Sequence, residues 1–240
     1  MNELRRYFDA HDGRVMEKWA HYLDAYDHHF ARFRNREVHV LEIGVNEGGS
    51  LQMWKEYFGP EAHIYGVDVK EKCRQYEEDR IRIWIGDQGD RAFLRELRRS
   101  IPRLDIVVDD GGHTMSQQIA TFEELFPHLA PDGVYVCEDT HTSYWQEFGG
   151  GYRARGTFME YAKDLVDRLN AWHSRDPESF RVDELTRTMH SLHFYPSMVV
   201  VEKRPMEPPY ERKVGAGKRG ATPAGRLQAR VAAWRARLKR

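Results

Sequence analysis

The amino-acid sequence predicts an α/β fold built on a mainly parallel sheet, and three observations support this prediction. The chain has 240 residues, which suffice for one substantial domain and are few for two. Short apolar runs alternate with segments of helical periodicity, as expected for parallel strands covered by helices on both faces. Near the C-terminus, two further strand-like runs flank Pro196 and Ser197. We therefore expect a Rossmann-like sheet with a C-terminal antiparallel hairpin at its edge.

The predicted elements follow one another in a regular order. Aromatic and apolar residues recur at near-helical spacing over residues 3–33, with Gly13 as a break, so residues 1–34 are predicted to form an N-terminal helical segment. The main domain is expected at 35–204. Its parallel strands are predicted at 38–43, 63–67, 81–85, 105–108 and 134–137. Its helices are predicted at 51–58, 91–100, 117–129 and 157–172, and the hairpin strands at 192–195 and 198–203.

The remaining residues, 205–240, form a basic tail rich in proline and glycine. Residues 204–240 contain 11 Lys or Arg and 2 Asp or Glu. Such a tail is typical of proteins that bind nucleic acid or acidic lipid, but a solvated extension explains it more simply. Only residues 227–238 place apolar side chains on one helical face, so we expect a last helix there.

The composition bounds where the protein works. Hydrophobic residues make up 40% of the chain and charged residues 31%, and no apolar run approaches a membrane span. The first residues lack the apolar core of a secretory signal. Cys73 and Cys137 stand alone, without the spacing of a metal site or a disulfide framework. We therefore expect a cytoplasmic protein that does not bind a membrane.

The first three strand ends carry residues suited to a nucleoside. In open α/β sheets, ligands bind beyond the carboxyl ends of the strands. The first strand ends at "LEIGVNEGGS", which lacks the G-x-G-x-x-G spacing of dinucleotide sites and has a looser E-x-G-x-x-x-G form. Asp68 ends the second strand, where a carboxylate usually holds the ribose hydroxyls, and Asp87 and Gln88 end the third. This set favours S-adenosylmethionine over NAD, although the glycine loop alone also suits a structural turn.

The fourth and fifth strand ends carry five ionisable side chains: Asp109, Asp110, His113, Glu138 and Asp139. Carboxylates grouped without cysteine ligands indicate a hard cation, most plausibly Mg²⁺. Each of these residues alone could be a helix cap or bond to the backbone. Because side chains alternate along a strand, the first two aspartates are expected to face opposite ways, with Asp110 toward the metal. Asp109 would then face the cofactor or a backbone donor.

At this point the sequence resembles a known family. "LEIGVNEGGSLQMW", "GVDV", "IGDQGD", "VVDDGGHTMSQQIATFEELFPHLAPDGVYVCED" and "THTSYW" look like the metal-dependent sugar O-methyltransferases of the mycinamicin (macrolide deoxysugar) type. Related mycobacterial enzymes act on methylmannose oligosaccharides. The resemblance covers roughly residues 16–145 and implies the sheet of a class I methyltransferase. The macrolide members carry an additional N-terminal domain that is not recognisable here, which leaves the acceptor open.

The resemblance implies a role for individual residues. Asp110, Glu138 and Asp139 would ligate the metal, and His113 would be the general base. Tyr144 and Trp145 could stack on a sugar ring, or could simply pack against their neighbours. The "KWAHY" stretch at 18–22 contributes as well. The S-adenosylmethionine site would be formed by Glu42, Gly44, Asn46, Ser50, Asp68, Asp87, Gln88 and Asp109.

The expected function is thus an S-adenosylmethionine- and Mg²⁺-dependent O-methyltransferase that methylates a saccharide hydroxyl. The acceptor would be a glycosylated natural product or a methylated mannose-type oligosaccharide, with no nucleic acid as partner, and the enzyme a homo-oligomer. One alternative is a catechol-type small-molecule O-methyltransferase. Others are an oxidoreductase like the cephalosporin hydroxylases and a nucleoside- or RNA-binding module that uses the basic tail.

Overall fold

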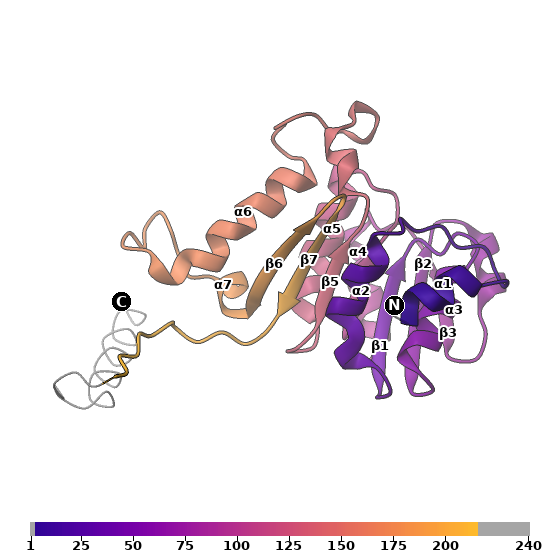
Figure 1. Cartoon of the computed structure of the whole chain (residues 1–240). Coiled ribbons are helices and arrows are strands. Elements are labelled where there is room, and N and C mark those ends of the chain that lie inside the picture. Colours follow the sequence, from indigo (N-terminus) through magenta and orange to yellow (C-terminus); the bar gives the residue numbers. More distant parts are fainter. Residues whose placement is uncertain (1–2, 216–240) are drawn as a thin grey trace. The chain divides into compact units, whose positions relative to one another are not determined.

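The computed structural model describes residues 3–215 (Figure 1). The chain divides into two units, residues 1–206 and residues 207–240. Every described helix and strand belongs to the first unit, whereas the described residues 207–215 of the second form neither. The helix expected at 227–238 lies outside the described residues. No helix among residues 3–215 is long and apolar enough to cross a membrane.

A seven-stranded sheet forms the centre of the first unit, with the order β3-β2-β1-β4-β5-β7-β6. The first five strands pair in parallel, while β7 runs antiparallel to both β5 and β6. This confirms the predicted parallel sheet with a C-terminal hairpin at its edge (Figure 1). The strands are β1 (Val38–Ile43), β2 (Ala62–Asp68), β3 (Ile81–Ile85), β4 (Ile106–Asp109), β5 (Val134–Cys137), β6 (Met189–Tyr195) and β7 (Met198–Lys203).

Helices cover both faces of the sheet and bury two separate apolar cores. Side chains alternate along β1, so Val40 and Leu41 point to opposite faces of the sheet. Val40 packs in one core with residues of α2 and α3, and Leu41 packs in the other core with residues of α4, α5 and α6. Because helices cover both faces, every residue of β1, β4 and β5 is buried. The helices are α1 (Glu3–Ala10), α2 (Tyr22–Phe30), α3 (Gly49–Phe58), α4 (Arg91–Ser100), α5 (Met115–Leu125), α6 (Phe158–Asn170) and α7 (Glu184–Thr188). Short 3₁₀ helices lie at Ala31–Phe33, Glu71–Tyr76, Phe126–His128, Thr140–Tyr144, Gln146–Phe148 and Ala171–His173.

The topology fixes where a ligand can bind. From β1 the chain proceeds outward through β2 and β3, and then returns to place β4 on the other side of β1. The strand order therefore reverses between β1 and β4. Their carboxyl ends form the crevice in which ligands of open α/β sheets bind.

The N-terminal segment differs from the prediction of a helical segment broken only at Gly13. Residues 11–21, between α1 and α2, are not helical, and we call them the crossing segment. They pack so tightly on the start of α3 that a Cβ atom at Gly49 would lie 2.3 Å from the carbonyl oxygen of Arg14. The near-helical spacing of Met16 and Trp19 has a different cause, because residues 15–20 line a cavity at the carboxyl ends of the strands.

Candidate active site at the carboxyl ends of the strands

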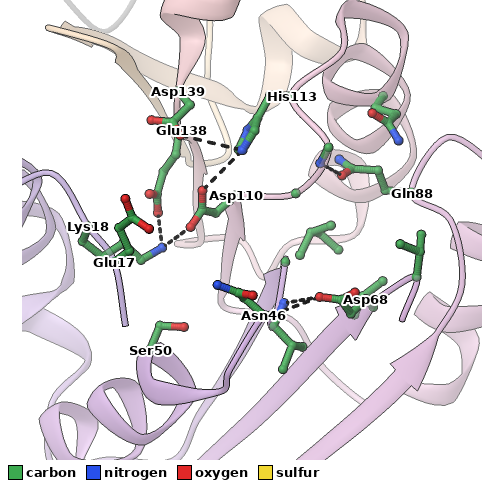
Figure 2. Close-up of a pocket in the computed structure, with 18 of the residues that line it drawn as sticks. Glu17, Lys18, Asn46, Ser50, Asp68, Gln88, Asp110, His113, Glu138 and Asp139 are labelled. Atoms are coloured by element: carbon green, nitrogen blue, oxygen red, sulfur yellow. Dashed lines mark hydrogen bonds and ion pairs between the residues drawn. The ribbon is translucent and has the colours of Figure 1, made fainter. Parts of the chain in front are cut away.

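The cavity at the switch point has a volume of about 760 Å³ and is lined by the crossing segment and the loops after β1 to β5 (Figure 2). It brings together most of the residues predicted from the sequence, although they come from five strand ends spread along the chain. The predicted residues that line it are Gly44, Asn46, Ser50, Asp68, Asp87, Gln88, Asp110, His113, Glu138 and Asp139.

The glycine loop after β1 is held by Asp68. The backbone amides of Val45 and Asn46 donate to Asp68 Oδ2 at 3.1 and 3.0 Å. Gly44 has a φ of 98°, and a Cβ atom there would lie 2.0 Å from the carbonyl oxygen of Asp110. A side chain at position 44 is therefore excluded both by conformation and by contact.

Gln88 is fixed on three sides at the third strand end. Its Nε2 donates to Asp109 Oδ1 at 2.8 Å and to Thr121 Oγ1 at 3.0 Å, and its Oε1 accepts from the amide of Gly112 at 2.7 Å. Asp109 also accepts a hydrogen bond from the hydroxyl of Tyr135 at 3.0 Å. Burial raises the pKa of Asp109 to about 7.

Of the two partners expected for Asp109, the cofactor and a backbone donor, the structure shows the second, because Asp109 accepts a hydrogen bond from the backbone of Gly111. Asp109 faces away from Asp110, as alternation predicted, but it does not line the cavity and is almost fully buried. Its carboxyl group instead supports Gln88 from behind. Asp109 is therefore a positioning residue and not a residue that contacts a ligand in the cavity.

Glu42, Asp110, Glu138 and Asp139 form the acidic cluster, and a buried lysine lies among them. Lys18 Nζ is 2.6 Å from Asp110 Oδ2, 2.9 Å from Glu138 Oε1 and 3.0 Å from Glu42 Oε1 (Figure 2). The Lys18 side chain is 1% exposed. Glu42 is fully buried and does not line the cavity, which differs from the expectation that it contacts the cofactor.

Burial dominates the electrostatics of the acidic cluster. It raises the pKa of Asp110 to about 6, against the opposing effect of Lys18. Burial, followed by repulsion from Asp110, raises the pKa of Glu138 well above its ordinary value. Burial alone would lower the pKa of Lys18, but the surrounding carboxylates raise it well above its ordinary value. Two hydroxyls add support, since Ser50 Oγ donates to Glu42 Oε2 at 2.6 Å and Tyr26 donates to Glu138.

The other side of the acidic cluster faces His113. Its Nε2 lies 3.9 Å from Asp110 Oδ1 and 3.7 Å from Asp139 Oδ2. His113 and Asp139 both have left-handed backbone conformations, with φ of 56° and 51°. Trp19 Nε1 and the Tyr22 hydroxyl donate to Asp139 Oδ1 at 3.1 and 3.0 Å, which turns its Oδ2 toward the imidazole. Burial lowers the pKa of His113, so the ring is neutral at pH 7.

The donor set on this side fits a hard divalent cation. Ligand atoms of Asp110, His113 and Asp139 all lie within 4.8 Å of one another, and Asp110 and Glu138 form a second such group with Glu42. Carboxylate oxygens dominate, as Mg²⁺ requires. The left-handed turn at Asp139 explains how two consecutive residues, Glu138 and Asp139, reach one site despite strand alternation.

The two aromatic residues expected to stack on a sugar lie outside the cavity lining. Tyr144 and Trp145 are each 46% exposed, at the end of a 3₁₀ helix. The Trp145 ring lies 4.5 Å from the ring of His141, which does line the cavity and lies 6.2 Å from Trp19 on its other side. His141 and Trp19 thus form an aromatic part of the cavity wall, and the Trp145 ring packs next to His141.

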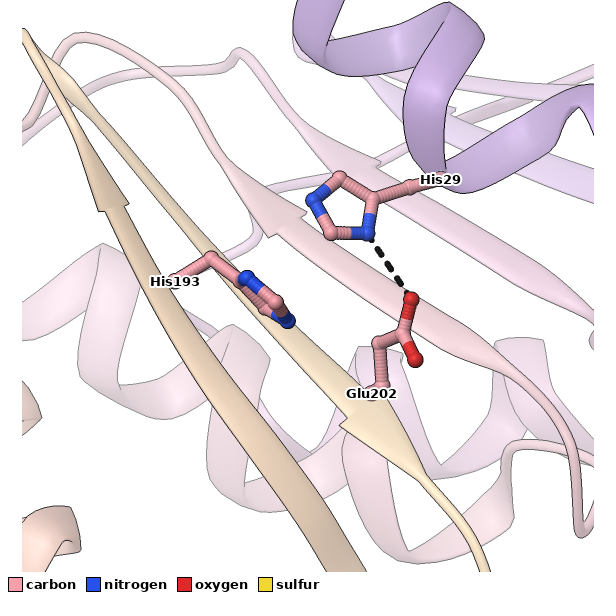
Figure 3. A group of neighbouring side chains, drawn as sticks. All are labelled: His29, His193 and Glu202. Carbon is pink, nitrogen blue, oxygen red and sulfur yellow. Dashed lines mark hydrogen bonds and ion pairs between the residues drawn. The ribbon is translucent and has the colours of Figure 1, made fainter.

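A second group of metal-ligating side chains, the histidine group, comprises His29, His193 and Glu202 (Figure 3). It joins α2 to the hairpin, away from the cavity. His29 Nδ1 lies 2.8 Å from Glu202 Oε1, and His29 Nε2 lies 3.0 Å from the Tyr195 hydroxyl. Arg32 Nη1 also donates to Glu202 at 3.1 Å. Every ring nitrogen of His29 is therefore occupied by another protein group.

Sequence reasoning missed the role of Lys18. The resemblance drew attention to residues 18–22, but nothing local in the sequence indicates that this lysine reaches carboxylates 24, 92 and 120 residues away. Three acidic strand ends that meet in a buried place do require a cation, and this was the available signal.

Comparisons with known proteins agree with the geometry. Residues 41–140 match a family of methyltransferase domains, Methyltransf_24. An 8-demethyl-8-alpha-L-rhamnosyl tetracenomycin-C 2'-O-methyltransferase of Streptomyces olivaceus is 42% identical over 198 residues, 78% of this chain and 52% of the relative. The mycinamicin VI 2''-O-methyltransferase of Micromonospora griseorubida is 39% identical over 188 residues, 74% of this chain and 47% of that protein.

A solved structure extends the likeness to three dimensions. The MycE methyltransferase of the mycinamycin pathway, in complex with Mg and SAH, is 38% identical with a TM-score of 0.75, covering 85% of this chain and 54% of that one. The chain spans about half the length of the curated relatives it matches. The resemblance to sugar O-methyltransferases is thereby confirmed as a likeness, and residues 41–140 match the model of a methyltransferase domain family.

Proposed function

We propose that this protein is an S-adenosylmethionine- and Mg²⁺-dependent O-methyltransferase that methylates a hydroxyl of a glycosylated small molecule or an oligosaccharide. The observation that carries the proposal is the meeting of two half-sites in one cavity. The loop held by Asp68 lies on one side, and Asp110 and Asp139 face His113 on the other. A methyl donor and an ionisable acceptor can meet in such a cavity.

The cofactor is assigned to the half of the cavity formed by β1 to β3. Gly44 lines this half without a side chain, and Asn46, Asp87 and Gln88 place polar groups around the space for a nucleoside. Ser50 is engaged with Glu42 and closes the inner end. The MycE methyltransferase was solved with SAH, the demethylated form of the same cofactor, in two crystal forms.

The divalent cation is assigned to Asp110 and Asp139, with Glu138 next to them. When bound, Mg²⁺ acts as a Lewis acid that holds neighbouring hydroxyls and lowers the pKa of one of them. Asp110 and Asp139 would bind the cation, and hydrogen bonds from Trp19 and Tyr22 hold the Asp139 carboxylate in place.

His113 is assigned as the general base. Its neutral imidazole accepts the proton of the acceptor hydroxyl at Nε2 while the acceptor oxygen bonds to the methyl carbon. The sulfur–methyl bond breaks in the same step, and its electron pair remains on sulfur, so the sulfonium becomes a neutral thioether.

The acceptor is assigned to the open side of the cavity, along the aromatic wall of Trp19 and His141, with Trp145 next to His141. Aromatic faces suit the apolar face of a sugar ring. Mycinamycin VI, a glycosylated macrolide, is present in one MycE structure, which is 39% identical to this chain over 85% of it.

The chain has two free buried cysteines, Cys73 and Cys137, which supports a cytoplasmic location.

The test incubates the protein with S-adenosylmethionine, Mg²⁺ and a panel of rhamnosides, mannose oligosaccharides and catechols. We expect a mass increase of one CH₂ unit on a saccharide, with S-adenosylhomocysteine formed in equal amount and EDTA abolishing both. Methylation of catechols alone would replace the proposal with the catechol-type reading. Consumption of oxygen without S-adenosylhomocysteine would replace it with the oxidoreductase.

A further inference from the structure

The ammonium group of Lys18 lies among three carboxylates, as a bound metal ion would. It lies within 3.0 Å of oxygens from three carboxylates, and these come from the ends of three neighbouring strands, β1, β4 and β5. Glu42 and Glu138 are as deeply buried as the lysine itself. Carboxylates removed from water in this way are strongly destabilising without a cation next to them.

The acidic cluster is divided into two halves by the way its oxygens point. Asp110 Oδ2 contacts Lys18, whereas its Oδ1 faces His113. Glu138 Oε1 contacts Lys18 and Tyr26, and Glu42 contacts Lys18 and Ser50. The inner half, comprising Glu42, Asp110 Oδ2 and Glu138 Oε1, is therefore filled. The outer half, Asp110 Oδ1 and Asp139 Oδ2, faces the cavity.

The crossing segment supplies both the cation of the inner half and the restraint on the outer half. Lys18 is followed directly by Trp19, whose indole donates to Asp139 Oδ1. The segment is anchored at its start by the amide of Gly49, which donates to the Val15 carbonyl at 3.2 Å. These contacts hold the ammonium in one place without a ligand in the cavity.

We propose that Lys18 is the permanent cation of the acidic cluster: it assembles Glu42, Asp110 and Glu138 in the metal-free protein and confines a divalent cation to the outer half. Lys18 is thus a positioning residue that makes the site mononuclear. Without Lys18, the inner half would be a second oxygen-lined cation site. The Asp110 carboxylate would separate it from the first, because one of its oxygens belongs to each half. The assignment of the outer half rests on the proposed function, whereas the assembly of the inner half does not.

The experiment compares the full chain with its Lys18→Met variant, first by thermal unfolding in EDTA. We expect the melting temperature of Lys18→Met to fall by roughly 10 °C, because three buried carboxylates lose their cation. Saturating Mn²⁺, added without any other ligand, is expected to restore most of the lost melting temperature in Lys18→Met. Titration calorimetry with Mn²⁺ gives one equivalent bound to the unsubstituted protein and two to Lys18→Met.

The matched control is Lys163→Met, on α6. Lys163 is also paired with a glutamate, Glu160 at 2.6 Å, but its side chain is 48% exposed. We expect its melting temperature to change by less than about 2 °C, with one Mn²⁺ bound.

Two outcomes overturn the proposal for Lys18. The first is an equal loss of melting temperature with and without Mn²⁺, which would make Lys18 a purely structural residue. The second is a single, more tightly bound Mn²⁺ in Lys18→Met, which would make Lys18 a competitor for the same position. Failure of the unsubstituted protein to bind Mn²⁺ would instead overturn the metal-dependent function, while the comparison in EDTA still tests the inner half.

If Lys18→Met does not fold, the double variant Lys18→Met/Glu42→Gln decides the question. It removes one carboxylate together with the lysine, so we expect it to fold and to melt closer to the unsubstituted protein. A double variant that is no better than Lys18→Met would overturn the proposal.

Discussion

The acidic cluster and the histidine group both bring metal-ligating atoms within 4.8 Å of one another, yet they differ in what those atoms have left to offer. In the histidine group, both ring nitrogens of His29 and one carboxylate oxygen of Glu202 already have protein partners (Figure 3). In the acidic cluster, Asp110 and Asp139 each keep one oxygen on the side facing a cavity.

The difference shows that proximity of ligand-type residues does not by itself make a site. His29, His193 and Glu202 connect a helix to a hairpin, and Arg32 supplies the positive charge for the carboxylate. The acidic cluster also contains a charge partner, Lys18, but that partner covers only one side of it. What distinguishes the acidic cluster is therefore the unused donor atoms that face a cavity of ligand size.

The largest expected effect separates His113 from His193. His113→Ala is expected to lower kcat roughly 10²–10⁴-fold, because it removes the base at the acceptor hydroxyl. His193→Ala, the matched change in the histidine group, should leave kcat within about twofold, since it lies outside the cavity lining. Rates of S-adenosylhomocysteine release measure both. A loss for His113→Ala no greater than that for His193→Ala would contradict the distinction between the two regions.

The next effect concerns stability, and here the change in the histidine group is expected to cost more than the change at His113. His29→Ala removes a buried hydrogen-bond partner of Glu202, and we expect it to lower the free energy of unfolding by about 1–3 kcal/mol. His113→Ala should cost less, since its Nδ1 is buried without a hydrogen-bond partner in the described part of the chain. Urea denaturation in EDTA gives both values. If His29→Ala proved the more stable variant, the structural role of the histidine group would be wrong.

The smallest effect is the pH dependence of stability in the histidine group. Burial opposes the charged form of Glu202, but hydrogen bonds from His29 and Arg32 outweigh it and lower the pKa of Glu202 to about 2. Its contribution is therefore present above its ordinary pKa of about 4.5 and is lost as the pH falls toward 2. Burial lowers the pKa of His29, so stability also falls as the pH drops below about 6.5, where the unfolded chain binds that proton.

The measurement is the urea midpoint at several values from pH 7 down to pH 3. Glu202→Gln should be less stable than the unsubstituted protein at pH 7 and should lose less stability on acidification. His193→Gln is the matched control. A slope for Glu202→Gln as steep as that of the unsubstituted protein would show that other groups dominate the acid response.

The sequence predicted the sheet well because parallel strands buried on both faces leave a strong local pattern. The strands at 81–85 and 134–137 were predicted with the bounds that the structure has, and the hairpin was placed correctly. The site residues were predictable for a related reason: the carboxyl ends of parallel strands meet at one edge, so residues far apart in the chain could be grouped by position alone.

What the sequence could not supply were contacts made across the fold. The supporting role of Asp109 depends on Gln88 and Tyr135, and only the direction of its side chain followed from alternation. The crossing segment was predicted to be helical because Met16 and Trp19 have near-helical spacing. In the structure both residues line the cavity instead. Trp145 was linked to the site by its neighbours in the sequence, but His141 is the residue of that loop that reaches the cavity.

The contact between Gly44 and the Asp110 carbonyl has a consequence for how such a domain can diversify. The two loops touch through main-chain atoms, with no room for even a methyl group between them. The distance between the loop after β1 and the loop after β4 is thus set by the backbone and not by side chains. Side chains elsewhere along the cavity can be exchanged without changing that distance. A single methyl group at position 44 would shift both loops at once.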